Sequence, residues 1–316
     1  MGYPGKVVYP KGYREFESRS LRQHNFLSVS THLPEQVMRP RCIEWIKNTR
    51  FTSCVFAIIE NNMDFKQSTF GEIIDSEKEM VLTADERYGA YYINASEFNV
   101  LLGEFIKSVD PDKFIFAIFL SQVKKHSTLA LFSVVRLHHT QAMMDLRQVL
   151  EAGACASYAI ANTDSTDFAD VGENGVLDAS QSLTNKRYKW LGEKYPAGSS
   201  AIRNMKESIN SSAAHSNIIY AHNNFNLNDT TRKFETPFFD IEDEYLVKTN
   251  LWTVGNIIMG LVDLFYGVAK DHGGMVFADD FIKRLKTLEA ENHRLKVEMM
   301  ETDRYKKSLD KSSQSA

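Results

Sequence analysis

Residues 111–162 read PDKFIFAIFLSQVKKHSTLALFSVVRLHHTQAMMDLRQVLEAGACASYAIAN and carry the longest helical signal in the chain. After Pro111 no proline or glycine occurs before Gly153. Nearly all members of one stripe are apolar, and they recur at alternating spacings of three and four, as on one face of a helix. The stripe consists of Phe132, Val135, His139, Ala142, Leu146, Val149, Gly153, Ala156 and Ile160. We therefore predict one very long helix, roughly 75 Å at about 1.5 Å per residue, with a bend near Lys124–Thr128 as the alternative.

Helical patterns dominate the remainder of the chain, and weak strand signals are confined to residues before 93. The sequence thus predicts an all-α fold. We expect an elongated antiparallel helical bundle with one very long helix and a projecting C-terminal coiled-coil helix. The predicted organisation is an extended N-terminal arm over 1–33, a helical bundle domain over 34–272, a C-terminal coiled-coil helix over 273–307 and a disordered tail over 308–316.

Composition excludes some classes of function. The 316 residues carry a net charge of −4, which gives no overall attraction to nucleic acid, although Lys6–Arg50 is locally basic. Three cysteines do not make a disulfide framework, so we predict a reducing compartment and a cytoplasmic location.

One apolar stretch, Leu251–Ala269, is long enough to span a membrane. It contains Asn256 and Asp263 and is followed by Lys270, Asp271 and His272. Because charge inside a membrane is costly, we predict a buried bundle helix and no membrane partner.

Two predicted helices carry polar residues that could form a site. The candidate catalytic residues are Arg147 and Glu151, four apart on the long helix, and His215 on a later one. The candidate binding residues are Arg136, Ser212 and His222. The pattern fits either an ion pair that fixes helix packing or a polar pocket between two helices. The HExxH and paired CxxC patterns are missing, so we predict neither a metal nor another cofactor.

The segments LRQVLEAGACASYAIAN (146–162) and NMKESINSSAAHSNIIYAH (204–222) carry a resemblance that extends over residues 130–225. They resemble uncharacterised all-helical bacterial proteins that are distantly similar to the HEPN group. Active members of that group are metal-independent ribonucleases, some of them in phage defence or toxin systems. The resemblance implies that Arg147 would hold a phosphate and that His215 would be the general acid or base. The active HEPN ribonucleases share a motif of an arginine, a polar residue and a histidine soon after them. This chain does not match that motif, because His215 lies too far beyond Arg203.

The C-terminal segment carries heptads that predict self-association. The seam of a parallel two-stranded coiled coil would be formed by Leu285, Leu288, Asn292, Leu295 and Met299. An asparagine at a central a position favours two strands in register. The alternative is a single amphipathic helix that docks on its own bundle, because only about three heptads are present.

We therefore predict a non-catalytic helical scaffold or interaction protein that forms a homodimer through its C-terminal helix and has a possible protein partner. The alternative is a HEPN-like protein that binds or cleaves RNA. Small residues at 152, 153 and 156 also predict the close approach of another helix, with 251–269 and its Gly255 and Gly260 as the candidate.

Overall fold

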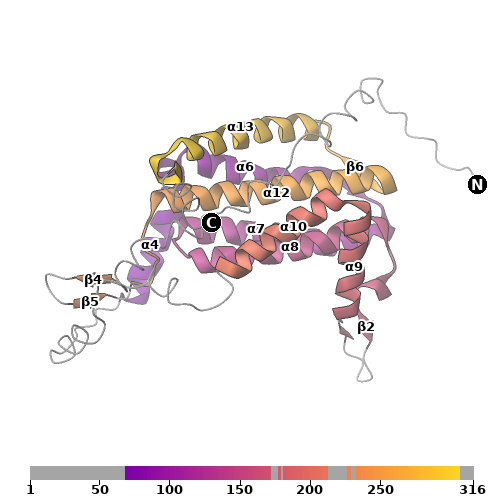
Figure 1. Cartoon of the computed structure of the whole chain (residues 1–316), viewed down its shortest axis with the longest axis horizontal. Helices are drawn as coiled ribbons and strands as arrows, with labels where there is room; N and C mark the ends of the chain where they lie inside the picture. The colour runs from indigo at the N-terminus through magenta and orange to yellow at the C-terminus, as the bar shows by residue number, and fades with distance from the viewer. Residues whose placement is uncertain are drawn as a thin grey trace, which may run out of the picture.

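The computed structural model describes residues 68–171, 177–178, 181–212, 226–228, 233–235 and 237–306. The fold is predominantly α-helical, as predicted (Figure 1). The predicted arm over 1–33, the tail over 308–316, His215 and His222 lie outside these residues.

Helix α12 (Glu244–His272) is the centre of the bundle. It packs against α6 (Ala90–Glu104), α7 (Phe114–Val135), α8 (His139–Ala161) and α13 (Phe281–Glu301). Figure 1 shows α12 running between the α6 and α13 side and the α7 and α8 side. By length and composition, α12 could cross a membrane, but most of its apolar stretch is buried by these neighbours. Within the described residues, the predicted burial of 251–269 is confirmed.

The prediction of one very long helix over 111–162 is wrong. A short 3-10 turn (Pro111–Lys113) leads into α7, and the helix ends at Val135 before α8 begins at His139. The two helices fold back on each other as a hairpin. The break also lies well beyond Lys124–Thr128, where the alternative bend was predicted.

The hairpin turn is a Schellman motif built on Leu137, whose φ of 58° lies in the left-handed region. The amide of His138 donates to the Ser133 carbonyl at 2.8 Å, and the amide of Leu137 donates to the Val134 carbonyl at 3.1 Å. A left-handed conformation is unfavourable for a side chain as large as leucine, so other contacts must stabilise it.

Asp240, far along the chain, provides such contacts. Its carboxylate accepts a hydrogen bond of 2.6 Å from the amide of His139, the first residue of α8. Its own amide donates to the carbonyl of Leu137 at 2.9 Å. Asp240 therefore satisfies backbone groups on both sides of the turn, as a capping residue does.

The ambiguous stretch before residue 93 is helical in its described part. Helix α4 (Phe70–Leu82) begins with a capping box in which Thr69 and Glu72 exchange side-chain and backbone hydrogen bonds. Helix α5 (Ala84–Tyr88) follows it. In Figure 1, α4 lies at the opposite end of the bundle from α9 (Gln181–Lys194).

The strands are short and occur in antiparallel pairs. Strand β1 (Ile106–Val109) pairs with β6 (Met275–Phe277) and joins the end of α6 to the start of α13. The other pairs are β2 (Asp170–Val171) with β3 (Leu177–Asp178), and β4 (Asn226–Asn228) with β5 (Lys233–Glu235). A 3-10 turn (Ser165–Asp167) precedes β2, and α10 (Pro196–Ser212) follows α9.

Helix α13 does not project from the bundle, which corrects the predicted projecting helix. Its inward side packs on α6 and α12 of the same chain. Four of the five predicted interface residues are buried there and Leu288 is partly buried: Leu285, Leu288, Asn292, Leu295 and Met299. The heptad pattern identified the buried side correctly, but the side is covered by the bundle rather than by a second copy.

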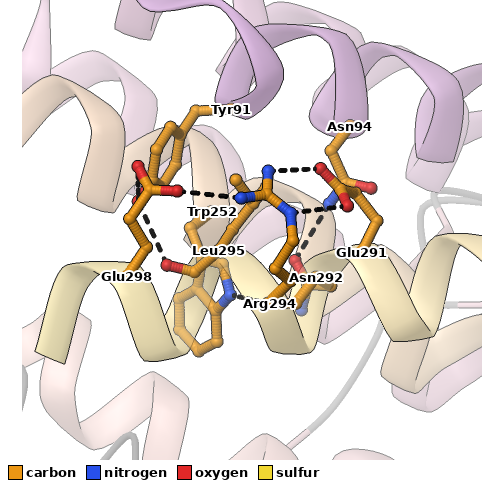
Figure 2. A network of polar contacts seen from close by, with 8 residues as sticks. All are labelled: Tyr91, Asn94, Trp252, Glu291, Asn292, Arg294, Leu295 and Glu298. Carbon is orange, nitrogen blue, oxygen red and sulfur yellow. Dashed lines mark hydrogen bonds and ion pairs between the residues drawn. The ribbon is translucent and has the colours of Figure 1, made fainter. Parts of the chain in front are cut away.

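Asn292 is the polar centre of this contact (Figure 2). It accepts a hydrogen bond of 3.1 Å from Asn94 on α6, and its amide donates to Asn256 on α12 at 3.2 Å. The indole of Trp252 donates to the Asn292 carbonyl at 2.9 Å. Asn292 thus completes the hydrogen bonding of buried side chains in its own chain. In the predicted coiled coil, its partner would have been the asparagine of a second copy.

Candidate functional site: the polar junction of α8, α9 and α10

Three helices, α8, α9 and α10, pack together around a group of polar side chains. Arg147, Glu151 and Cys155 follow one another at intervals of four on α8, which places them on one side of that helix. Tyr188 comes from α9, and Lys206 comes from α10. We call these five residues the polar junction.

Glu151 is the acceptor at the centre of the junction. Its Oε1 lies 3.3 Å from Nε of Arg147 and 2.9 Å from Nζ of Lys206. Burial favours the neutral acid, but the hydrogen bonds and charges of Lys206 and then Arg147 outweigh burial and lower the pKa of the Glu151 carboxyl. Glu151 is therefore an anion at neutral pH and is already paired with two cations.

Lys206 is also held by Tyr188. Its ammonium donates to the Tyr188 hydroxyl at 3.0 Å and lies 4.9 Å from the centre of the ring. Burial alone would lower the pKa of Lys206, but Tyr188 and Glu151 together raise it. An amine with a raised pKa stays protonated at neutral pH, so it is a poor base and a poor nucleophile.

Cys155 is not activated. Burial raises the pKa of its thiol, and the charge and hydrogen bond of Arg187 offset only part of that effect. Arg187 is itself buried and donates to the Asp167 carbonyl at 3.0 Å. Because the thiolate is the nucleophilic form, Cys155 is inert at neutral pH.

The structure brings together two of the three candidate catalytic residues, Arg147 and Glu151, as the ion pair that their spacing predicted. His215 and His222 lie outside the described residues. Ser212 is the last residue of α10, the helix that supplies Lys206.

Arg136 does not belong to the junction. It lies at the turn between α7 and α8, where its guanidinium is 3.4 Å from Glu77 of α4. The same carboxylate lies 2.9 Å from Nε2 of His138. His138 also contacts the rings of Phe238 and Phe239. Arg136, predicted as a binding residue, therefore holds α4 against the hairpin turn.

Sequence reasoning missed a second polar pair, His126 and Asp145. Nδ1 of His126 on α7 lies 2.8 Å from Oδ1 of Asp145 on α8. The other oxygen of this buried carboxylate accepts from Gln141 at 2.9 Å. A carboxylate in this position orients an imidazole, as in catalytic and metal-binding histidines. The pair is 19 residues apart in the sequence, so it becomes visible only once the hairpin is known.

The imidazole of His126 is oriented as in a general acid or base, but the described residues give it no nucleophile to act on. Its Nε2 has no hydrogen-bond partner in the part of the chain that the structure describes, and the side chain is 26% exposed. Among those residues, no hydroxyl or thiol hydrogen-bonds to it. A reacting group would therefore have to come from a bound molecule.

Over the described ranges, no group of three or more histidine, cysteine, aspartate and glutamate side chains is arranged to hold a metal ion. Comparisons with protein-family models, curated proteins and solved structures find no match to this chain. The resemblance to the HEPN group therefore stays a prediction from the sequence.

Proposed function

We propose that the protein is a non-catalytic helical scaffold or interaction protein. The observation that carries this proposal is the neutralisation of the polar junction, where Glu151 is paired with Arg147 and Lys206. Nothing in the junction is poised as a base or nucleophile at neutral pH, because Lys206 stays protonated and Cys155 stays a thiol.

Exposed apolar side chains at one end of the bundle support an interaction role. Phe70 and Ile74 on α4 are 87% and 63% exposed. They lie about two turns and about one turn, respectively, before Glu77, which binds the hairpin turn. Phe238, beside His138 at the same turn, is also exposed. Apolar side chains of this size gathered at one end are typical of contact surfaces.

The homodimer stays part of the proposal, but its formation now requires a change in the position of α13. The seam of α13 is covered by α6 and α12, so self-association through Leu285, Leu295 and Met299 requires α13 to leave its own bundle. Light scattering after size exclusion tests this: we expect a dimer that dissociates on Leu288→Asp. A monomeric wild type would overturn the homodimer, and a dimer that survives the change would place the interface elsewhere.

RNA binding or metal-independent RNA cleavage is the second candidate. It is favoured by Arg147, whose terminal nitrogens have no partner among the described residues, and by the oriented imidazole of His126. Incubation of RNA with wild type, Arg147→Ala, His126→Ala and His215→Ala in the presence of a chelator separates the candidates. The scaffold proposal expects identical, intact RNA throughout. Cleavage by wild type that is lost in His126→Ala or His215→Ala would overturn it.

A further inference from the structure

The contact between His126 of α7 and Asp145 of α8 holds one nitrogen of the imidazole and leaves the other free. The Nδ1–H group of His126 donates to Oδ1 of Asp145 at 2.8 Å. The side chain of Asp145 is only 5% exposed, and Gln141 donates to its other oxygen at 2.9 Å, so the carboxylate is held in place. A carboxylate that accepts from Nδ1 fixes the ring proton on that nitrogen.

The free nitrogen, Nε2, therefore carries a lone pair. Because Nδ1 faces a buried carboxylate, the opposite edge of the ring, which carries Nε2, points away from that carboxylate, and the side chain of His126 is 26% exposed. Within the described part of the chain, no donor hydrogen-bonds to Nε2. The imidazole is thus itself an available nucleophile, and histidine is one of the side chains that form covalent intermediates.

The neighbouring side chains of the two helices suit an anion on this nitrogen. Gln122 lies one turn before His126 on α7, and Gln148 lies about one turn after Asp145 on α8. Both amides are exposed, as is Lys125 beside His126. Amides can donate hydrogen bonds to a phosphoryl oxygen without adding negative charge, and a lysine adds a positive charge.

We propose that His126 is a phosphoryl-acceptor site, which takes a phosphoryl group on Nε2 from a donor that contains a P–N bond. The lone pair of Nε2 attacks phosphorus and forms the new N–P bond. The P–N bond of the donor breaks, and its electron pair leaves with the donor nitrogen; phosphoramidate in its ammonium form releases ammonia. Nδ1 keeps its proton throughout, so no base is required, and one N–P bond replaces another without an oxidant or reductant.

Asp145 acts in this step as a positioning residue. The imidazole becomes a cation as the Nε2–P bond forms, and the carboxylate at 2.8 Å from Nδ1 stabilises the developing charge. A buried aspartate stabilises an imidazolium in the same way in hydrolytic triads. The contact also directs the reaction to Nε2, because Nδ1 has no lone pair to offer while it carries its proton.

A phosphoryl group on His126 adds about two negative charges, as on other phosphorylated side chains. The surface of the α7–α8 hairpin around Gln122 and Gln148 then changes from neutral amides to an anionic face. A change of this kind can switch the contacts of an interaction protein. This last consequence rests on the proposed function, whereas the acceptor chemistry of His126 does not.

Phosphoramidate added to the full chain tests the acceptor site. Mass spectrometry of peptides follows labelling at each histidine, and phosphorus NMR identifies the nitrogen that carries the label. We expect His126 to be labelled on Nε2 about tenfold faster than His293, an exposed histidine of α13, because a hydrogen bond to a charged group stabilises the imidazolium. His126→Gln should lose the fast label and keep the label on His293.

Asp145→Asn should slow the labelling of His126 to the rate of His293 and place part of the label on Nδ1. Asp75→Asn, at an exposed position of α4, is the matched control and should behave as wild type. Circular dichroism checks that each variant is folded. If Asp145→Asn unfolds, Gln141→Ala replaces it, because it frees one oxygen of Asp145 and keeps the contact with His126; it should also slow the labelling.

Labelling of His126 no faster than that of His293 would overturn the acceptor site, and so would a label on Nδ1 in wild type. A rate and a labelled nitrogen that both stay the same in folded Asp145→Asn would overturn the role of Asp145. These outcomes are separate from the scaffold proposal, which light scattering and the incubation with RNA test.

Discussion

Leu261 of α12 lies directly over Gly153 of α8, so closely that a Cβ on Gly153 would be 2.5 Å from Cδ2 of Leu261. The small residues near the end of α8 predicted this approach, and α12 is the helix that makes it. The glycines of α12 are not part of the contact: Gly255 lies against Phe98 of α6, and Gly260 faces open space. Gly153 alone is therefore sufficient for the close approach of the two helices, because the side chain of Leu261 fills the space beside it.

Gly153→Ala should destabilise the protein. The added methyl group must displace Leu261 in a packed core, and such overpacking typically costs about 1–3 kcal/mol. Gly260→Ala is the matched control, since its methyl group would meet no neighbour. It should be neutral or stabilise the helix by up to about 1 kcal/mol. Urea denaturation measures both, and equal stabilities would contradict the close packing.

Asn292→Ala should cost about 1–3 kcal/mol in the free energy of unfolding. The change leaves the amide of Asn94 and the carbonyl oxygen of Asn256 buried without their partner. His293→Ala, at the neighbouring exposed position, is the control and should have little effect. A wild-type urea midpoint in Asn292→Ala would show that water replaces the asparagine at no cost.

Asp240→Ala should destabilise the hairpin turn by about 0.5–2 kcal/mol, the usual cost of losing a helix cap. The substitution removes the acceptor for the amide of His139 while Leu137 keeps its left-handed conformation. Asp112→Ala, at an exposed position before α7, serves as the control. Thermal unfolding compares the two, and an unchanged melting temperature for Asp240→Ala would show that the turn does not depend on this cap.

The polar junction should make the stability of the protein depend on pH. The pKa of Glu151 is lowered in the folded protein, because Lys206 and Arg147 outweigh burial. Its contribution to stability is therefore present above the ordinary pKa of a glutamate and is lost as the pH falls through the lowered value. Glu151→Gln should be less stable than wild type at pH 7, and the difference should shrink in acid. A difference that is constant with pH would mean that the pairing is not electrostatic.

The sequence by itself determined the helical class and the position of the buried helix at the centre of the bundle. The apolar pattern predicted a buried helix over 251–269, and α12 (Glu244–His272) contains this stretch. It also predicted the pairing of Arg147 with Glu151, which are four residues apart on α8. These features follow from local periodicity, since spacing along a helix fixes which side chains share a face.

Tertiary structure alone decided where the helices break and what covers each face. The turn at Leu137 has no glycine or proline to mark it and is capped by Asp240, 101 residues beyond the amide that it binds. Lys206 reaches Glu151, and Asp145 reaches His126, only because helices distant in sequence pack together. In the same way, the heptads of α13 showed which side is buried around Asn292. An apolar stripe specifies that a surface must leave water, but α6 and α12 decide what it meets.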